Sequence, residues 1–190
     1  MGHIPTVSVA IPFLNPGPFL ADAIRSVFAQ TFDDWELILV NDGSTDGSVE
    51  MAASISDPRV RVVDDGKPMG LVPRLNQIID LSRGKYIARM DADDMMHPRR
   101  LETQVAFLEE YPGVQVVDTG AFVLDSKRRP VGVRGLQSSA PPNTTQALKH
   151  GVVLHPSVIA RREWYLENRY DPMFPRAEDR ELFVRALESN

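Results

Sequence analysis

The chain has 190 residues, of which 43% are hydrophobic and 25% are charged, a composition typical of an ordinary globular domain. It contains no cysteine, which excludes disulfide frameworks, thiolate zinc sites, iron–sulfur clusters and cysteine nucleophiles. Its net charge of −5 argues against a nucleic-acid binder that works by neutralising phosphates.

The charge is unevenly placed, because residues 1–60 hold two basic and eight acidic residues. Such an acidic N-terminal third could attract a bound cation. No apolar run approaches the roughly 20 residues that a membrane-spanning helix needs, and the first residues lack a basic segment followed by an apolar one. The sequence therefore predicts neither a transmembrane segment nor an export signal.

Strand-like apolar runs alternate with segments of helical periodicity over the first 111 residues. The expected strands are residues 6–12, 35–40, 59–63 and 85–90, and the expected helices are residues 19–30, 47–56, 71–81 and 98–111. Alternation of this kind predicts an α/β fold with a mostly parallel central sheet flanked by helices.

Beyond residue 111 the pattern is weaker. We expect a strand over residues 114–124, a long loop rich in Gly, Pro and Ser over 127–143, a strand over 152–159 interrupted at Pro156, and an amphipathic helix over 178–187. Long loops of this type often carry function, so residues 127–143 are expected to form a flexible lid. Because the last helix runs almost to the C-terminus, we also expect a single domain truncated from a longer chain.

Acidic residues gather where three of the expected strands end. The clusters are Asp42 with Asp46, Asp64 with Asp65, and Asp91 with Asp93 and Asp94. Ligands of open α/β sheets bind at the carboxyl ends of the strands. Carboxylates at positions i and i+2 can converge on one hard cation, Mg²⁺ or Mn²⁺, which shares oxygen ligands with a diphosphate. The alternative is that these acidic turns serve only as caps and solvated loops.

Two acidic motifs, one of them the Asp42 and Asp46 cluster, allow both a structural and a functional interpretation. Asp46 can cap the next helix, whereas Asp42 can accept a hydrogen bond from a nucleobase while Gly43 lets the backbone pass close to the ligand. Glu178 and Asp179 open a helix, where acidic residues stabilise the helix dipole. The functional alternative for this pair is a general base.

A set of motifs in a fixed order covers nearly the whole chain. They are Ser8–Pro12 followed by Asn15, Ser26–Thr31, Trp35–Ile38, Asn41–Asp46, Gly70–Leu71, Leu75–Asn76, Gly84–Ile87, Asp91–Asp94, Pro98 with Arg100–Glu102, His155–Ser157 and Ala177–Leu182. The set strongly resembles the family 2 inverting glycosyltransferases of the GT-A fold.

This resemblance implies a single GT-A catalytic domain over residues 1–190, with a Rossmann-like sheet. Residues 1–96 correspond to the nucleotide-sugar-binding half and residues 97–190 to the acceptor-side half. The implied donor is a nucleotide-diphosphate sugar, most often a UDP-sugar, and the acceptor is a saccharide or lipid-linked hydroxyl. Relatives of this kind build cell-surface polysaccharide or glycolipid at the cytoplasmic face of the membrane, so a cytoplasmic location with peripheral membrane association is expected.

The resemblance also implies roles for particular residues. Those expected to contact the donor are Pro12, Asn15, Asp42, Gly43, Asn76, Asp91 and Ala92. Asp91 and Asp93 match the DxD element, which holds Mn²⁺ or Mg²⁺ against the diphosphate. Asp179 matches the general base that takes the proton of the acceptor hydroxyl, and Glu178 is the less favoured candidate. His155 either approaches the diphosphate or acceptor, or is structural.

The sequence departs from the family at Leu14, where an aromatic residue usually precedes the Asn and can contact the base. Arg74 is expected to be a solvated helical residue. Two other enzyme classes fit less well: an aspartyl phosphotransferase, because Met95 stands where Thr or Val is usual, and a sugar nucleotidyltransferase, because no Gly-rich basic loop follows the first strand. The non-enzymatic alternative is a nucleotide-sugar-binding module, or an excised domain, without turnover.

Overall fold

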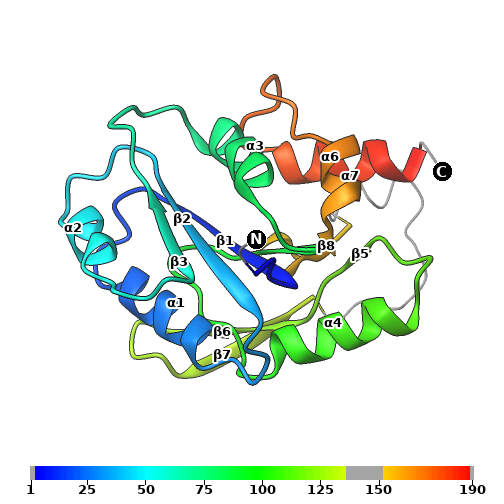
Figure 1. Ribbon diagram of the computed structural model, residues 1–190, viewed down its shortest axis with the longest axis horizontal. Helices are drawn as coiled ribbons and strands as arrows, with labels where there is room; N and C mark the ends of the chain where they lie inside the picture. Colours follow the sequence, from blue (N-terminus) through cyan, green and yellow to red (C-terminus); the bar gives the residue numbers. More distant parts are fainter. Residues whose placement is uncertain (1–2, 136–151, 189–190) are drawn as a thin grey trace.

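The computed structural model describes residues 3–135 and 152–188. Its centre is a six-stranded sheet in the order β3-β2-β1-β4-β8-β5 (Figure 1). The sheet strands are β1 (Val7–Phe13), β2 (Trp35–Asn41), β3 (Val60–Val63), β4 (Tyr86–Arg89), β5 (Val116–Val117) and β8 (Ile159–Arg161). The helices are α1 (Phe19–Phe28), α2 (Ser48–Ala53), α3 (Leu71–Leu81), α4 (Arg100–Glu110), α6 (Arg162–Glu167), α7 (Glu178–Glu188) and the short 3₁₀ helix η1 (His155–Ser157).

The strand order reverses at β1. The chain runs outward from β1 through β2 to β3, and then returns to place β4 on the other side of β1, with all four strands parallel. In open α/β sheets a ligand binds outside the carboxyl ends of the strands at such a reversal. The fold therefore indicates that a ligand would bind at the loops that follow β1, β2 and β4.

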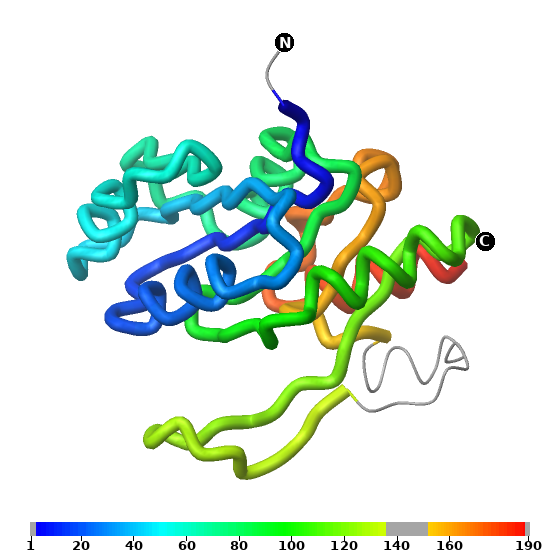
Figure 2. The backbone as a smooth tube through the Cα atoms, turned by 60° about the horizontal axis from the view of Figure 1, so that its bottom comes forward, coloured from blue at the N-terminus to red at the C-terminus, as the bar shows by residue number. Residues whose placement is uncertain are grey.

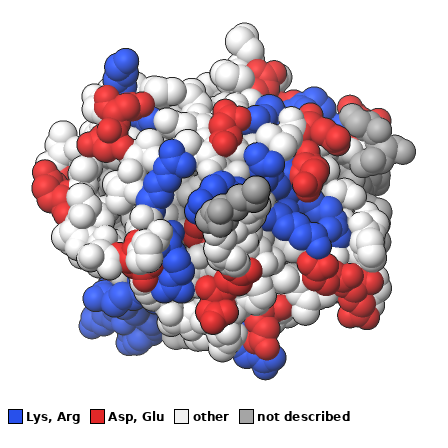
Figure 3. Space-filling model, viewed as in Figure 1, with Lys and Arg blue, Asp and Glu red and all other residues white. Residues whose placement is uncertain are grey.

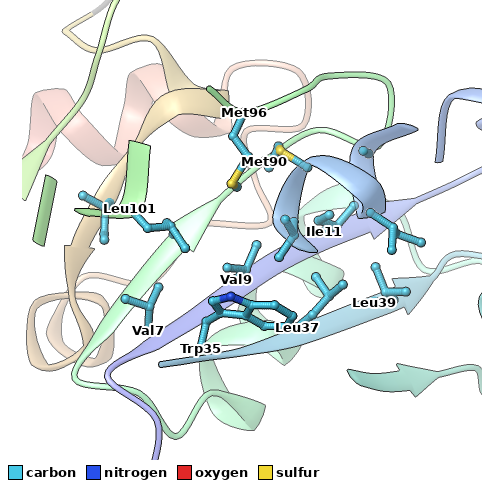
Figure 4. Close-up of a cluster of buried hydrophobic side chains, with 14 of the residues drawn as sticks. Val7, Val9, Ile11, Trp35, Leu37, Leu39, Met90, Met96 and Leu101 are labelled. Carbon is cyan, nitrogen blue, oxygen red and sulfur yellow. The ribbon is translucent and has the colours of Figure 1, made fainter. Parts of the chain in front are cut away.

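Strand alternation divides the core into two layers. Val7, Val9 and Ile11 face the side covered by α1 and α4, while Ala10 faces the side covered by α3, α6 and α7. Figure 4 shows the first layer, in which Trp35 and Leu37 from β2 pack beside the β1 side chains. Because both faces are covered, β1 and β2 are buried along their whole length.

The expected α/β fold with a mostly parallel central sheet is confirmed. The helix over residues 71–81 has the expected bounds, and the other elements before residue 111 agree within a few residues. Beyond this point two expectations are wrong. Residues 152–159 do not form a strand, because the region around Pro156 turns as η1 and the strand begins only at Ile159.

Residues 114–124 do not form one strand either, because they divide between β5 in the main sheet and β6 (Ala121–Leu124) in a separate hairpin with β7 (Pro130–Arg134). This hairpin extends away from the body of the molecule (Figure 2). Part of the expected lid, residues 130–134, is thus strand, and residues 136–143 of it lie outside the described residues.

The surface carries charges of both signs. On the face seen in Figure 3, Lys and Arg side chains alternate with Asp and Glu rather than forming one basic patch, in keeping with the net charge of −5. Within the described ranges, no helix has the length and apolar character needed to cross a bilayer.

Candidate functional site

The loops that follow β1 and β2 are tied to each other by side chains. Asn15 adopts a left-handed backbone, with φ of 48°, and its Oδ1 accepts a hydrogen bond of 2.7 Å from the Thr45 N–H. The Asn15 N–H donates in return to Ser44 Oγ at 2.9 Å, and the Gly17 N–H donates to Asp46 Oδ2 at 2.7 Å. These contacts hold two loops at the carboxyl edge of the sheet in one arrangement.

Asp42 follows β2 and organises the start of α3. Its carboxylate accepts hydrogen bonds from the Met69 N–H at 2.6 Å, from the Gly70 N–H at 3.0 Å and from Arg74 Nε at 3.1 Å. Gly43 has a φ of +89°, which favours glycine, and it lies against Pro68. Pro12 is buried in β1 and pairs with Val40 in the sheet register.

Arg74 is not the solvated residue expected from the sequence. Its side chain is fully buried and forms ion pairs with Asp42 and, at 2.7 Å, with Asp65. A buried charge is costly unless it is paired, and two carboxylates provide that pairing. The hydrogen bond from Arg74 lowers the pKa of Asp65 to about 2, and the same contact raises the pKa of Arg74.

Asn76 has its side-chain amide engaged within the fold. Its Nδ2 donates to the Tyr170 carbonyl at 2.9 Å, and its Oδ1 accepts from the Tyr170 N–H at 3.1 Å. The side chain thus pairs with the backbone of Tyr170 as a neighbouring strand would. The expected contact of Asn76 with the donor stays a prediction.

Asp91–Asp93, the expected DxD element, follows β4 after Met90. Ala92 is buried, Asp93 is exposed, and Asp91 is partly exposed and pairs with the buried Arg89 at 2.5 Å. Burial, and then the charges of Asp91 and Asp93, raise the pKa of Asp94. The charges of Arg89 and Arg100 oppose this rise.

The carboxylates of Asp91 and Asp93 suit a hard divalent cation that is also bound by oxygen atoms of a diphosphate. In residues 3–135 and 152–188, no group of three or more Asp, Glu, His or Cys side chains could hold a metal by itself. Mg²⁺ and Mn²⁺ bind through one or two carboxylates together with phosphate oxygens and water. Asp91 and Asp93 could supply those carboxylates.

Glu178 and Asp179 differ in their surroundings. Glu178 is 7% exposed, and its Oε2 has no hydrogen-bond partner among the described residues. Asp179 is half-buried and its Oδ1 accepts a hydrogen bond of 2.7 Å from the Arg180 N–H. Asp179 is thus the carboxylate that an incoming hydroxyl could reach.

A pocket of about 390 Å³ lies between the start of α3 and the start of α7. Its lining is Met69–Pro73, Pro172, Pro175, Arg176 and Glu178. Most of these side chains are apolar, and Glu178 adds a carboxylate. The same pocket wall is held by Asp42, since Asp42 accepts hydrogen bonds from Met69 and Gly70.

His155 is buried beside Tyr170, with its Nε2 at 2.8 Å from the Tyr170 hydroxyl oxygen. Burial, and then the charge of Arg89, hold the pKa of His155 well below its usual value, so the ring is neutral. Burial likewise raises the pKa of Tyr170, and the charge of Asp179 adds to that rise. The charge of Arg89, which pairs with Asp91, opposes that rise.

The burial of two arginines, Arg74 and Arg89, was not predicted from the sequence. Arg74 lies on a helix, where charged residues are common, so the helical periodicity did not indicate that its side chain is buried. Arg89 did carry a signal of burial, because it stands in an otherwise apolar strand, and arginine is almost never buried unless it is paired.

Comparisons with known proteins identify the family of this chain. Residues 8–165 match the family described as Glycosyl transferase family 2. The chain is 43% identical over 139 residues to Bacillus subtilis EpsE, a protein named as a glycosyltransferase. The aligned region covers 71% of this chain and 48% of EpsE. It is also 28% identical over 193 residues to a Haemophilus influenzae protein named as a glycosyltransferase, covering 94% of this chain and 59% of that protein.

Solved structures share the fold. S. aureus TarS residues 1–349 in complex with UDP-GlcNAc superposes with a TM-score of 0.75 at 19% identity, covering 94% of this chain and 52% of that one. The mannosyltransferase PcManGT from Pyrobaculum calidifontis, in complex with GDP-Man and Mn²⁺, gives a TM-score of 0.70 at 18% identity, covering 95% and 51%. The chain thus spans about half the length of these proteins.

Proposed function

The chain belongs to glycosyl transferase family 2, and on that basis we propose that it transfers a sugar from a nucleotide-diphosphate sugar to an acceptor hydroxyl with inversion. One observation supports this proposal: Asp42 and Asp91–Asp93 follow β2 and β4 on either side of β1, where the strand order reverses. Asp42 also holds Met69 and Gly70, which line one pocket together with Glu178, the neighbour of Asp179 in the sequence. Nucleotide, diphosphate and acceptor would meet there.

The donor is proposed to be a UDP-sugar. The complexes of two related folds with UDP-GlcNAc and with GDP-Man support a nucleotide-sugar donor. Asp42 would face the base, and the Asn15 and Gly43 loops would pass along the nucleotide. Of the four lone-pair sites of Asp42, part is already used by Met69, Gly70 and Arg74, so its remaining capacity fits a single base N–H.

The pocket beside α3 suits a sugar ring. Its apolar walls, including Leu71 and Pro73, would pack against the C–H face of the ring, and the unpartnered Oε2 of Glu178 would accept a hydrogen bond from a ring hydroxyl. A buried acceptor without a partner is costly, so a ligand that donates to it is bound more tightly. In this assignment Glu178 binds sugar and does not act as the base.

Asp179 would take the proton of the acceptor hydroxyl as its oxygen attacks the anomeric carbon from the face opposite the diphosphate. A single displacement of this kind inverts the anomeric configuration. A divalent cation bound by Asp91 and Asp93 would neutralise negative charge on the departing diphosphate. The nucleotide diphosphate leaves with the bonding electrons of the broken C–O bond.

The two halves of the chain would divide this work. Residues 1–96 would bind the donor and residues 97–190 would face the acceptor, a saccharide or lipid-linked hydroxyl in polysaccharide or glycolipid synthesis at the cytoplasmic face of the membrane. The alternative is a nucleotide-sugar-binding module without turnover. It is favoured by one observation, namely that the chain spans about half the length of its relatives.

Two substitutions separate binding from turnover. We expect Asp93→Ala to abolish Mn²⁺-dependent binding of UDP, measured by titration calorimetry. Asp179→Asn keeps that binding but lowers sugar transfer by about 10²–10⁴-fold, the usual contribution of a general base. Transfer is measured as Mn²⁺-dependent release of UDP from UDP-sugars in the presence of a panel of saccharide acceptors.

The control is Glu178→Gln, which changes the neighbouring carboxylate. It is expected to raise the KM for the donor while keeping measurable turnover. Equal loss of UDP binding in Asp93→Ala and Asp179→Asn would contradict the assigned roles. UDP binding without any transfer by the unmodified chain would favour the binding-module alternative.

A further inference from the structure

Arg89 is a buried cation with a single ion pair. It ends β4, it is 4% exposed, and its Nη2 lies 2.5 Å from Asp91 Oδ1. No second carboxylate forms an ion pair with it in the part of the chain that the structure describes. Because a buried guanidinium depends strongly on its counter-charge, Asp91 is held by this contact much more firmly than a surface carboxylate would be.

The backbone of Arg89 is fixed on both sides. Its N–H donates to the Val158 carbonyl at 2.9 Å, and its own carbonyl accepts from Arg100 Nη2 at 2.9 Å. It also pairs in register with Ala10 of β1. The guanidinium therefore extends from a rigid point of the sheet.

Among the described residues only Asp91 forms an ion pair with Arg89, although the charge of Arg89 also acts on Asp94. Burial keeps His155 neutral by lowering its pKa, and keeps Tyr165 and Tyr170 neutral by raising theirs. Arg89 Nε and Nη1 are buried and have no hydrogen-bond partner among the described residues. The ion pair with Asp91 is thus the principal interaction of this side chain.

Only one carboxylate oxygen of Asp91 forms the ion pair with Arg89. Its Oδ1 is held by Arg89, while its side chain remains 40% exposed, so Oδ2 is the oxygen available to a cation. A carboxylate that is already oriented loses less conformational freedom when it binds a metal. Groups that hydrogen-bond to metal ligands in this way typically account for about 10–100-fold in metal affinity.

We propose that Arg89 is a positioning residue that fixes Asp91 for binding of Mn²⁺ or Mg²⁺. This inference rests on the proposed function, because that function assigns the cation to Asp91 and Asp93. Arg89 acts only through Asp91 and touches neither the donor nor the cation.

The test compares three variants in calorimetric titrations of UDP at a series of fixed Mn²⁺ concentrations, which give the Mn²⁺ concentration that half-restores UDP binding. Arg89→Met removes the charge and is expected to weaken Mn²⁺ binding by about 10–100-fold. Arg89→Lys keeps the charge without the planar guanidinium and is expected to restore part of the affinity. If Arg89→Met does not fold, the Lys variant carries the test, with an intermediate loss expected.

Arg100→Met is the matched control. Arg100 is also a buried arginine in the same region, but it donates to the carbonyls of Arg89 and Val158 and to Gln104, and contacts no DxD carboxylate. Because Arg89 keeps its pairing with β1 and its hydrogen bond to Val158, Arg100→Met is expected to lower Tm, as the Arg89 variants do, while leaving Mn²⁺ affinity within about threefold of the unmodified chain.

The outcomes separate this inference from the function on which it rests. If the unmodified chain binds Mn²⁺ with UDP and Arg89→Met and Arg89→Lys bind it equally well or more tightly, the positioning role is wrong and the donor site stands. Equal losses in Arg89→Met and Arg100→Met would also overturn it. If the unmodified chain binds no Mn²⁺ with UDP, the proposed donor site fails and the positioning role fails with it.

Discussion

Arg74 joins two loops of the site through its two carboxylate partners. Asp42 and Asp65 lie at the ends of different strands, and a fully buried guanidinium connects both. Its hydrogen bond lowers the pKa of Asp65 from 3.8 to about 2. A pKa that is lower in the folded state means that folding is favoured by the ionised carboxylate.

The resulting pH dependence is testable with Asp65→Asn. The stability that ionised Asp65 contributes is fully present above pH 3.8 and is lost as the pH falls through about 2. We therefore expect the variant to unfold at lower urea concentration than the unmodified chain at pH 7, and the difference to shrink steadily below pH 4. A difference between the two that is the same at pH 7 and at pH 2.5 would contradict the assigned ion pair.

The residues of the site differ in how far the sequence predicts them. Asp91 and Asp93 are visible because carboxylates follow an apolar strand, and a parallel sheet places strand ends together. The contacts that hold the surrounding segments are less visible, since those of Arg74 with Asp65 and of Asn76 with Tyr170 join positions 9 and 94 residues apart. Periodicity reports which face of an element is buried, and it does not report which polar groups meet there.

At the scale of elements, α3 is joined to the segment before α7 by two kinds of contact. Asn76 pairs with the backbone of Tyr170, whereas Asp80 forms an exposed ion pair of 2.5 Å with Arg169. The pocket of about 390 Å³ lies between these same elements. The fixed backbone pairing should matter more for its shape than the exposed ion pair.

Substitutions at these two positions measure that difference. Asn76→Ala leaves backbone groups of Tyr170 unpaired and is expected to lower the free energy of unfolding by about 1–3 kcal/mol. Asp80→Ala, on the same helix, is expected to cost less than about 1 kcal/mol, as exposed ion pairs usually do. Urea unfolding gives both values. An Asn76→Ala variant of unchanged stability but lost UDP affinity would instead support the expected contact of Asn76 with the donor.

The elements themselves were predictable where each has its own periodicity, as in β1, β2 and α3. They were not where pairing decides the structure. Residues 114–124 read as one apolar strand, yet β5 pairs with β8 while β6 pairs with β7. The antiparallel direction of β8 against β4 depends on the path of the chain after η1, which no local pattern encodes.

At the scale of the whole molecule, the proposed site combines residues from distant parts of the chain. The N-terminal strands bring Asp42 and the DxD element, and the segment after β8 brings Tyr170, Glu178 and Asp179. A nucleotide-sugar would contact both parts at once, so its binding should stabilise the folded chain as a unit.

The most direct test of the account is therefore a thermal-shift panel of UDP, GDP, dTDP and CDP, each with and without Mn²⁺. We predict that UDP raises Tm clearly more than the other nucleotides do, and only when Mn²⁺ is present. The same rise should be absent in Asp93→Ala and present in Asp179→Asn. A Tm that no nucleotide changes, or a UDP-induced rise that EDTA leaves intact, would contradict a metal-dependent donor site at this edge of the sheet.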